Sequence, residues 1–333
     1  MQTDSIMVAG AGSWGTALAL VLARNGHRTY LWDSLDTHLD KLITERCNNY
    51  HLPGHSFPDT LSAVPRFTPL PEGLGHILIV VPCAGLTDVL EKLRSQPERD
   101  YRICLACKGI EPKTLQLNHV LVEQYLPGVP VAVLSGPSFA REVAEGLPTA
   151  VTIAAREPSV AADFSALFHC EVFRTYTHDD IVGVQVGGAV KNVMAIAAGI
   201  SDGLGYGANA RAALMARGLA EIMRLGQALG GRVDTLMGLA GLGDLALTCT
   251  DDQSRNRRFG LALSQGKSPE QAMAEIGQAV EGVHTTRVVC AMAEQHAVDM
   301  PISRQVQNVI DGKVSPHEAV HELLAREPKP ETG

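Results

Sequence analysis

Two hydrophobic patterns follow each other along the 333 residues of this chain, and the first is that of strands alternating with helices. Short apolar runs predict strands at Ser5–Gly10, Thr29–Trp32, His76–Pro82 and Val131–Leu134, with a further strand ending at Lys108 and Gly109. Between them the apolar residues recur every three or four positions, which predicts helices at Thr16–Arg24, Leu35–Arg46, Thr114–Tyr125 and a segment ending near Leu93. This alternation, closed by a strand–helix–strand unit over Thr149–Tyr176, is typical of an α/β fold with a doubly wound parallel sheet.

The second pattern is purely helical and starts after Asp179. We expect an α/β domain of residues 1–179 and an all-α domain of residues 180–333. The predicted helices of the second domain cover Asp180–Ile200, Asn209–Leu229, Arg257–Gln265, Ser268–Ile276, Thr285–His296, Pro301–Asp311 and Ser315–Ala325.

A lysine lies in the first of these helices on a face that carries almost no side chains. Gly187 and Gly188 precede Lys191 by one turn, and the small Ala195 follows it by one turn. Each glycine inside a helix costs about 1 kcal/mol relative to alanine, so a packing or functional reason should exist. A ligand lying beside the lysine is one reason, and close helix packing with a solvated lysine is the other.

Composition narrows the class of protein. A hydrophobic content of 45% suffices for two buried cores, and no run of 18 apolar residues predicts a membrane span. The first residues do not resemble a secretory signal, so we expect a cytoplasmic protein. The net charge of −8 argues against general nucleic-acid binding.

The seven cysteines are scattered along the chain. Cys104 and Cys107 form a lone CxxC with no second pair at zinc-finger spacing. We therefore expect buried free thiols and no metal site, with a metal or redox pair at these two positions as the alternative.

A glycine-rich turn joins the first predicted strand to the first helix. Gly10 permits a tight turn, Gly12 lets the backbone approach a pyrophosphate, and Gly15 lets helix and strand pack closely. The phosphates of a dinucleotide then lie at the helix N-terminus. This spacing in this setting predicts a Rossmann-type site for NAD or NADP.

Asp33 ends the second strand, where an acid would bind a ribose hydroxyl and favour NAD. It is alternatively an ordinary turn residue, with Trp32 in the contacting position. The choice between NAD and NADP stays open.

Ligands of such sheets bind beyond the carboxyl ends of the strands. Lys108, beside Gly109, and the segment 135–138 fall at such ends. A surface lysine is the plainer interpretation of Lys108, but its place beside a glycine at this edge favours a ligand role.

Two loops of the second domain carry charged groups. Asp244 follows glycine-spaced residues and either serves a site or caps the next helix. Ser254, Arg255 and Asn256 offer a helix start, a guanidinium and an amide, which suit a phosphate or carboxylate. Arg257 and Arg258 can equally form a solvated basic helix start.

With these features together, the chain resembles the bacterial-type NAD(P)-dependent glycerol-3-phosphate dehydrogenases. The resemblance extends from about residue 6 to residue 320, with the motifs in the same order. The motifs that carry the resemblance are residues 10–17, 49–54, 108–111, 135–140, the lysine–asparagine stretch at 191–192, 241–244 and 254–256. Two departures stand out: Trp32–Leu35 lacks the basic residues of many relatives, and Cys107 replaces a usual serine.

The resemblance implies a set of roles. Lys191 would be the proton acceptor. The substrate would contact Lys108, Gly136, Ser138, Lys191, Asp244, Ser254, Arg255 and Asn256. The cofactor would contact Gly10, Gly12, Ser13, Trp14, Gly15, Asp33, Lys108, Ala140, Arg255 and Glu281.

The implied reaction interconverts sn-glycerol 3-phosphate and dihydroxyacetone phosphate and supplies glycerophospholipid synthesis. One rival is a beta-hydroxyacid dehydrogenase of the same two-domain plan, which the phosphate-suited cluster at residues 254–256 opposes. The other is a non-catalytic dinucleotide-sensing module, which would not need a lysine, an acid and an anion site together. The apolar, helix-rich second half favours a homodimer.

Overall fold

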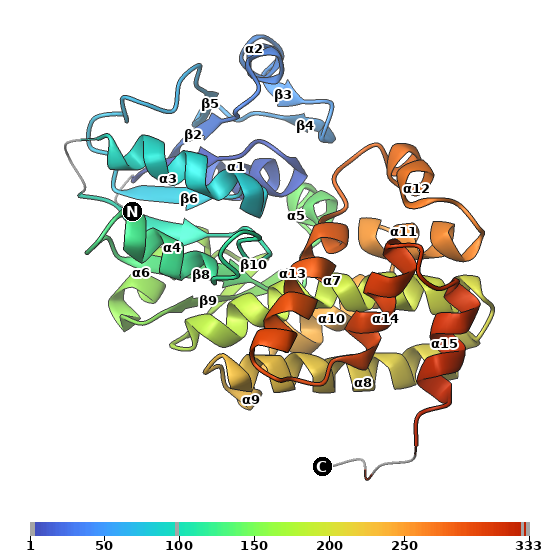
Figure 1. Cartoon of the computed structure of the whole chain (residues 1–333). Coiled ribbons are helices and arrows are strands. Elements are labelled where there is room, and N and C mark those ends of the chain that lie inside the picture. Colours follow the sequence, from blue (N-terminus) through green and yellow to red (C-terminus); the bar gives the residue numbers. More distant parts are fainter. Residues whose placement is uncertain (1–3, 97–99, 328–329, 331–333) are drawn as a thin grey trace.

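The sheet and the helical half predicted from the sequence are both present in the computed structural model, which describes residues 4–96, 100–327 and 330 (Figure 1). The eight strands of the main sheet lie in the order β10-β9-β8-β7-β6-β1-β2-β5, so the winding reverses between β1 and β6. Their bounds are β1 Ser5–Ala9, β2 Arg28–Trp32, β5 Leu61–Ala63, β6 His76–Ile79, β7 Arg102–Leu105, β8 Val131–Ser135, β9 Thr149–Ala155 and β10 Phe173–His178. Ligand sites of such sheets lie at this reversal.

The predicted fold class is confirmed, with one difference in strand direction. Six strands, β1, β2, β5, β6, β7 and β8, are all parallel. Strand β9 runs antiparallel to β8, and β10 runs parallel to β9. The connection between β8 and β9 contains only the six-residue helix α5 (Ala140–Glu145), which packs against α1. A helix this short does not carry the chain back along the sheet for another parallel strand.

Two pairs of helices flank the sheet. The pair α1 (Ser13–Arg24) and α6 (Pro158–Phe168) is in contact, and so is the pair α3 (Leu86–Arg94) and α4 (Asn118–Tyr125). The chain winds in opposite directions from β1 and from β6, so right-handed crossovers place the two pairs on opposite faces. The helix α2 (Asp36–Glu45) lies beside the edge strand β5.

The sequence pattern missed the shortest elements. Residues 48–54, for which the hydrophobic pattern predicted neither a helix nor a strand, contain most of an antiparallel hairpin of β3 (Cys47–Asn48) and β4 (Leu52–Ser56), and β5 was not predicted. Strand β7 ends at Leu105, three positions before Lys108. Strands of two to five residues are too short to show a clear hydrophobic period.

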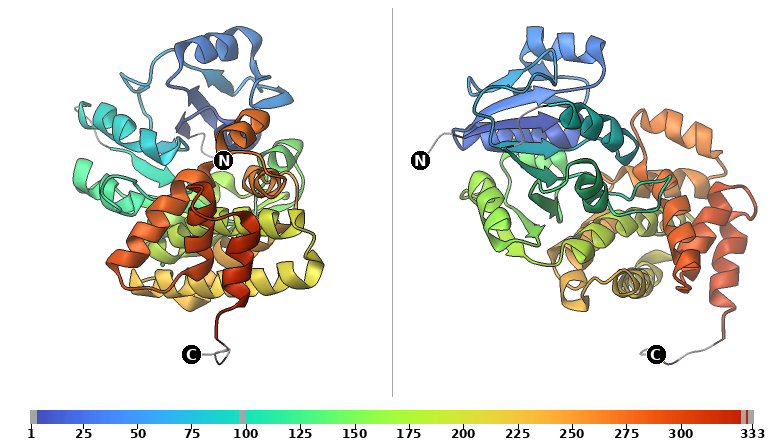
Figure 2. Two further views of the ribbon diagram at one scale, coloured as in Figure 1. Left: turned by 45° about the vertical axis from the view of Figure 1, so that its right-hand side comes forward. Right: turned by 60° about the vertical axis from the view of Figure 1, so that its left-hand side comes forward.

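One helix, α7 (Ile181–Gly203), forms the centre of the second domain (Figures 1 and 2). Five helices pack against it: α8 (Gly207–Ala228), α10 (Asp244–Thr250), α11 (Arg255–Ser264), α13 (Glu281–Gln295) and α14 (Pro301–Ile310). Within the described residues only α7 is long and apolar enough to cross a membrane, and 94% of its most apolar window is buried inside the protein. That burial is what a core helix of a folded domain shows.

The other helical elements surround α7 or extend from its neighbours. They are α8 Gly207–Ala228, α9 Val233–Leu236, the π-helical turn η2 Leu239–Gly243, α10 Asp244–Thr250, α11 Arg255–Ser264, α12 Pro269–Ile276, α13 Glu281–Gln295, α14 Pro301–Ile310 and α15 Pro316–Leu324.

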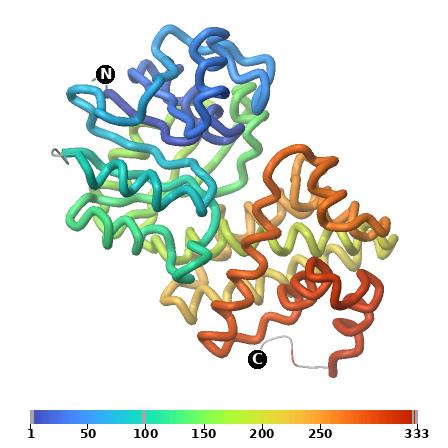
Figure 3. Tube along the Cα trace, turned by 45° about the horizontal axis from the view of Figure 1, so that its top comes forward, coloured from blue at the N-terminus to red at the C-terminus, as the bar shows by residue number. Residues whose placement is uncertain are grey.

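The two halves lie side by side and meet at α7 (Figure 3). The first turn of α7 contributes Ile181 and Val184 to the core of the sheet domain, and its later residues belong to the helical core. Ile110 and Leu117 from the first half pack into that second core. Because the cores interlock here, the division at residue 179 stays a prediction.

Protein atoms fill the space in front of Gly187 and Gly188 of α7. A Cβ at Gly187 would lie 2.5 Å from the carbonyl oxygen of Ala240 in η2, and one at Gly188 would lie 2.6 Å from Ser135 Oγ. The close-packing interpretation is therefore confirmed, and a bare face open to a ligand is wrong for these two positions. The glycines let η2 and the end of β8 approach the helix that carries Lys191.

We expect Gly187→Ala to lower the free energy of unfolding by about 1–3 kcal/mol, the range for overpacking a well-packed site. The added methyl group meets backbone of η2, which outweighs the helix propensity gained by alanine. Thermal and urea unfolding measure the effect. Gly75→Ala is the matched control, because a Cβ there meets no atom within 4 Å; equal stability of the two variants would contradict the packing role.

Candidate active site

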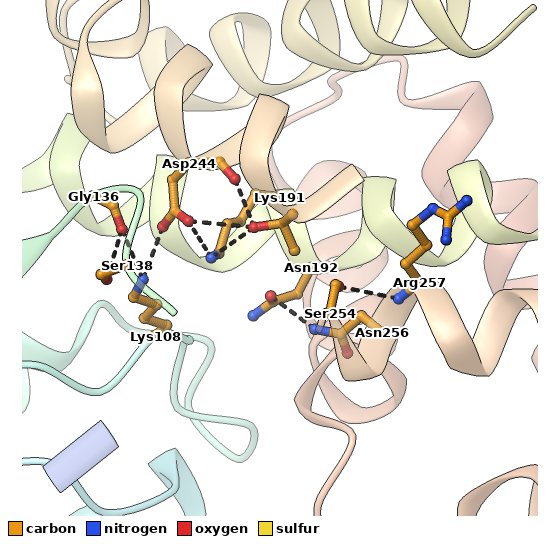
Figure 4. Close-up of polar contacts among 10 residues, drawn as sticks. Lys108, Gly136, Ser138, Lys191, Asn192, Asp244, Ser254, Asn256 and Arg257 are labelled. Carbon is orange, nitrogen blue, oxygen red and sulfur yellow. Dashed lines mark hydrogen bonds and ion pairs between the residues drawn. The ribbon is translucent and has the colours of Figure 1, made fainter. Parts of the chain in front are cut away.

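Lys191 lies in the middle of α7 with only 6% of its surface exposed. Its ammonium donates hydrogen bonds to Asp244 Oδ1 and, at 3.0 Å, to Thr248 Oγ1 (Figure 4). The expected alternative of a solvated lysine is therefore wrong. Thr248 was not predicted, although its position four residues after Asp244 places both on one face of α10.

Asp244 joins two lysines instead of capping a helix. It is the first residue of α10, and its side chain makes no capping hydrogen bond. The second carboxylate oxygen, Oδ2, lies 2.9 Å from Lys108 Nζ. The turn η2, held against Gly187, brings this carboxylate between lysines from the two halves of the chain.

Lys108 belongs to the same cluster. Its Nζ also donates to the carbonyl oxygen of Gly136 at 3.1 Å and lies 5.7 Å from the ring centre of Trp14. Ser138 donates to that carbonyl at 3.0 Å. This cluster thus joins the ends of β7 and β8, the first turn of α1 and the core of the second domain.

The pKa of Lys191 is lowered from 10.5 to about 8. Burial is the largest cause, because it removes water from the ammonium, and the neighbouring positive charge of Lys108 acts in the same direction. The carboxylate of Asp244 opposes both without cancelling them. An amine with this pKa exchanges a proton near neutral pH.

The start of α11 lies across the cavity from the sheet. Ser254 is its N-cap, as predicted, and accepts a hydrogen bond from the Arg257 amide at 3.2 Å. The amide of Asn256 joins three elements, because it donates to Asn192 Oδ1 in α7 and accepts from Gly282 N in α13, both at 2.9 Å. These contacts fix the helix start in relation to Lys191 (Figure 4).

The three arginines of this segment have different surroundings. The guanidinium of Arg257 is buried and pairs with Asp202 at 2.7 Å and with Asp252, so its expected alternative as part of a solvated helix start is wrong. Arg255 and Arg258 both line the cavity. Arg255 is half-buried and makes a long hydrogen bond of 3.5 Å to Gln278, whereas Arg258 is exposed. Arg255 is thus the better placed of the two to meet an anion inside the cavity.

A cavity of about 400 Å³ connects the two halves. Eleven of the predicted residues line it: Ser13, Trp14, Lys108, Ser138, Ala140, Lys191, Asp244, Ser254, Arg255, Asn256 and Glu281. Five predicted residues do not: Gly10, Gly12, Gly15, Asp33 and Gly136.

Sequence reasoning also overlooked residues in the cavity wall. Asn192 is 3% exposed, and its Nδ2 has no hydrogen-bond partner among the residues that the structure describes, so one buried donor is available toward the cavity. His51 lies in the hairpin turn between β3 and β4, where its carbonyl oxygen accepts a hydrogen bond from Ser13 at 2.7 Å. Both residues lie in motifs that carry the family resemblance, and this was the sequence signal that could have identified them.

The glycine-rich turn has the geometry expected of a dinucleotide site. Gly10 has φ 114°, and a Cβ there would lie 2.8 Å from the backbone of Val80. A Cβ at Gly15 would lie 1.9 Å from the Gly10 carbonyl oxygen, whereas one at Gly12 would meet nothing within 4 Å. The turn is therefore tightly packed on the protein side and open at Gly12, which fits the approach of a pyrophosphate.

Asp33 lies beside that turn. Its Oδ2 accepts the Ala11 amide at 3.1 Å and its Oδ1 accepts the Leu35 amide at 3.0 Å, so the carboxylate also shapes the local turn. Trp32, the alternative contact residue, is buried against Phe67. Asp33 is thus the side chain that this strand end presents near the turn.

Comparison with known proteins places the chain in one family. Two family models match it: NAD-dependent glycerol-3-phosphate dehydrogenase N-terminus over residues 5–161 and C-terminus over residues 180–321. This chain belongs to the NAD-dependent glycerol-3-phosphate dehydrogenase family. The expected family is therefore confirmed.

Individual relatives of this dehydrogenase match along nearly its whole length. The glycerol-3-phosphate dehydrogenase (NAD(P)+) of Actinobacillus pleuropneumoniae serotype 5b is 49% identical over 333 residues, with 99% of both chains covered. That of Nitrosococcus oceani is 51% identical over 326 residues, with 98% of this chain and 95% of the relative covered. The crystal structure of the Coxiella burnetii glycerol-3-phosphate dehydrogenase has a TM-score of 0.95 at 48% identity, with 97% of this chain and 99% of that chain covered.

In this dehydrogenase we expect the pKa of Lys191 to respond to its two charged neighbours in opposite directions. Lys108→Met removes a like charge and should raise it, whereas Asp244→Asn removes the counter-charge and should lower it. The rate at which a small amine-reactive reagent labels Lys191, followed by peptide mass spectrometry against pH, measures the value. A labelling midpoint near 10.5 in the unaltered protein, unchanged in both variants, would contradict the description of the cluster.

Proposed function

We propose how the residues of the cavity divide the glycerol-3-phosphate dehydrogenase reaction among themselves. The chain interconverts sn-glycerol 3-phosphate and dihydroxyacetone phosphate with NAD(P) as the cofactor. One observation carries the assignment of roles: the buried cluster of Lys191, Asp244 and Lys108 lies in a cavity shared by the glycine-rich first turn of α1 and the start of α11.

Lys191 exchanges the proton of the substrate's 2-oxygen. When bound, the nicotinamide ring accepts the hydride from C2 or returns it. An alcohol loses a hydride readily only if its oxygen gives up a proton, and the neutral amine of Lys191 takes that proton. A pKa of about 8 leaves part of the amine neutral near physiological pH, and burial is the main cause. In the reverse direction the ammonium returns the proton and stabilises negative charge on the oxygen.

Asp244 and Lys108 tune and position this amine. The Asp244 carboxylate holds the amine in place, together with the Thr248 hydroxyl. The charge of Lys108 disfavours a second ammonium nearby and, at the ends of β7 and β8, is available to the substrate beside Gly136 and Ser138. A substrate oxygen near both amines would accept hydrogen bonds from them.

Arg255 binds the phosphate of the substrate. A guanidinium matches the geometry of phosphate oxygens, and the unpartnered Nδ2 of Asn192 adds a neutral donor on the same side of the cavity. Ser254 and Asn256 support this site chiefly by fixing the helix start, because their polar groups are engaged within the protein. Binding energy from the phosphate holds C2 in line for hydride transfer.

The glycine-rich turn would hold the cofactor. Gly10, Gly12 and Gly15 shape the turn, and Ser13, Trp14, Ala140 and Glu281 line the cavity. Arg255 and Lys108, which line the same cavity, would contact both the cofactor and the substrate. The carboxylate of Asp33 and the absence of lysine or arginine at residues 33–38 favour NADH, because a 2′-phosphate would meet negative charge.

Further properties stay predictions. They are a homodimeric assembly, a cytoplasmic location and the use of the product in glycerophospholipid synthesis.

The assignment of Lys191 is tested by an assay of cofactor oxidation. Purified protein should oxidise reduced cofactor only when dihydroxyacetone phosphate is present. In Lys191→Met the turnover should fall at least about a hundredfold, the lower range for a lost acid–base group, while cofactor binding stays intact. Lys267→Met, at an exposed lysine paired with Glu275, is the control. Near-normal turnover in Lys191→Met would remove the residue from this role.

The pH dependence of kcat/KM shows which protonation state of Lys191 each direction of the reaction requires. With a pKa of about 8, kcat/KM for glycerol 3-phosphate oxidation should rise as pH rises through 8, because the neutral amine is required. For ketone reduction it should fall over the same range.

We expect Arg255→Ala to raise the KM for dihydroxyacetone phosphate by about 10–100-fold, which matches the 1.5–3 kcal/mol of a hydrogen bond to a charged group. The rate with unphosphorylated dihydroxyacetone should change little, because that substrate lacks the group concerned. The control is Arg287→Ala, at an exposed arginine of α13 that pairs with Asp311. An unchanged KM in Arg255→Ala would show that another group binds the phosphate.

We expect Asp33→Asn to raise kcat/KM for NADPH relative to NADH by about tenfold, equivalent to about 1.4 kcal/mol. The amide keeps an oxygen for the Ala11 amide and removes the charge that repels a 2′-phosphate. Asp36→Asn, at an exposed acid of the first turn of α2, is the matched control. If the NADPH/NADH ratio is the same in Asp33→Asn as in the unaltered enzyme, Asp33 does not select the cofactor.

A further inference from the structure

Two cysteines from neighbouring strand ends meet beside Lys108. Cys83 starts the short turn η1 (Cys83–Gly85) after β6, and Cys107 follows the end of β7. The two strands are paired in parallel, with Ile79 opposite Leu105. Paired strands lie about 4.8 Å apart, so the chain segments that leave them start as neighbours.

The side chain of Asn118 in α4 shows how closely the two sulfur atoms lie. Its Nδ2 is 3.3 Å from Cys107 Sγ and 3.5 Å from Cys83 Sγ, and it also donates to the Gly109 carbonyl at 3.1 Å. A Cβ at Gly109 would lie only 2.5 Å from Cys83 Sγ. The Cys83 sulfur thus rests on the segment that contains Cys107, Lys108 and Gly109.

The two thiols differ in exposure. Both are free, Cys83 is half-buried, and Cys107 is 9% exposed and lines the active-site cavity. Cys104, which shares the CxxC motif with Cys107, is fully buried in β7, and both cysteines of the motif are buried free thiols, as expected from the sequence.

We propose that Cys83 and Cys107 form a reversible disulfide on exposure to a peroxide, and that this disulfide inactivates the dehydrogenase by displacing Lys108. The formation of the bond is independent of the proposed function, whereas its effect on activity rests on it.

The chemistry balances with one peroxide for each disulfide. The Cys83 thiolate attacks a peroxide oxygen and gives a sulfenic acid, and for hydrogen peroxide the other oxygen leaves as water. The sulfur of Cys107 then attacks the sulfenyl sulfur, the S–S bond forms, and the sulfenic oxygen leaves as a second water with the proton of Cys107. The two thiols are oxidised and the peroxide is reduced. A dithiol reverses the change by thiol–disulfide exchange.

The surroundings of the two thiols indicate which of them reacts first with the peroxide. Contact with the Cys83 thiol and burial hold the pKa of Cys107 well above its ordinary value. Since the thiolate is the nucleophile, Cys107 is the poorer group to react first with peroxide. The more exposed Cys83 therefore reacts first, and Cys107 resolves the sulfenic acid.

The consequence for the active site follows from sequence adjacency. Lys108 directly follows Cys107, and its amine must reach both Asp244 and the Gly136 carbonyl. A disulfide draws the two sulfur atoms into a bond of about 2.05 Å and fixes the torsions on both sides of it. The segment 107–109 then shifts toward η1, and the Lys108 amine loses its place in the cluster.

The test compares the reduced, full-length enzyme with the enzyme after treatment with hydrogen peroxide. We expect a peptide map with one cross-link between the Cys83 and Cys107 peptides, a protein mass lower by two hydrogens, and an activity loss of at least about tenfold that a dithiol reverses. Cys83→Ser should keep its basal activity and resist inactivation. Cys170→Ser, at another half-buried cysteine, should be inactivated like the unaltered enzyme.

Three outcomes would overturn the proposal. One is the absence of a Cys83–Cys107 cross-link after oxidation. Another is a cross-link that leaves the activity unchanged, and the third is equal inactivation of Cys83→Ser. A reduced enzyme without any dehydrogenase activity would instead contradict the proposed function, and the peptide map would still decide whether the disulfide forms.

Discussion

The active site depends on a carboxylate that is shared by the amines of two lysines. Asp244 lies between Lys191, which is buried, and Lys108, and it pairs with both. Burial is the main cause that lowers the pKa of Lys191 to about 8, and the charge of Lys108 acts in the same direction. The same cluster therefore supplies both the position of the proton-exchanging group and its readiness to exchange.

Such a cluster requires three chain segments to be fixed within hydrogen-bond distance. Lys191 comes from the core helix α7, Asp244 from the junction of η2 and α10, and Lys108 from the end of β7. Helix α7 unites them, because it contributes to the cores of both halves and its glycines accept backbone from one side and β8 from the other. The rigidity of the buried helix explains why a residue as flexible as lysine can be held in one place.

The sequence alone determined the local features of the chain. Period and length predicted the long helices and the principal strands, and the glycine spacing predicted the turn at Gly10, Gly12 and Gly15. These features depend on neighbours in sequence, so a hydrophobic pattern or a steric requirement at one residue reveals them. Most of the site residues that the motifs predicted line the cavity, because a family's chemistry constrains residue type at fixed positions.

Only the tertiary structure decided which distant groups meet. It reversed the last two strands, gave Asp244 two lysines instead of a helix to cap, buried Arg257 in ion pairs, and brought Cys107 beside Cys83 and not Cys104. None of these contacts has a sequence period, because each joins segments that approach one another only when the cores pack. The sequence thus determined the elements and the chemical groups, and packing at α7 and at the ends of β6, β7 and β8 decided how those groups are paired.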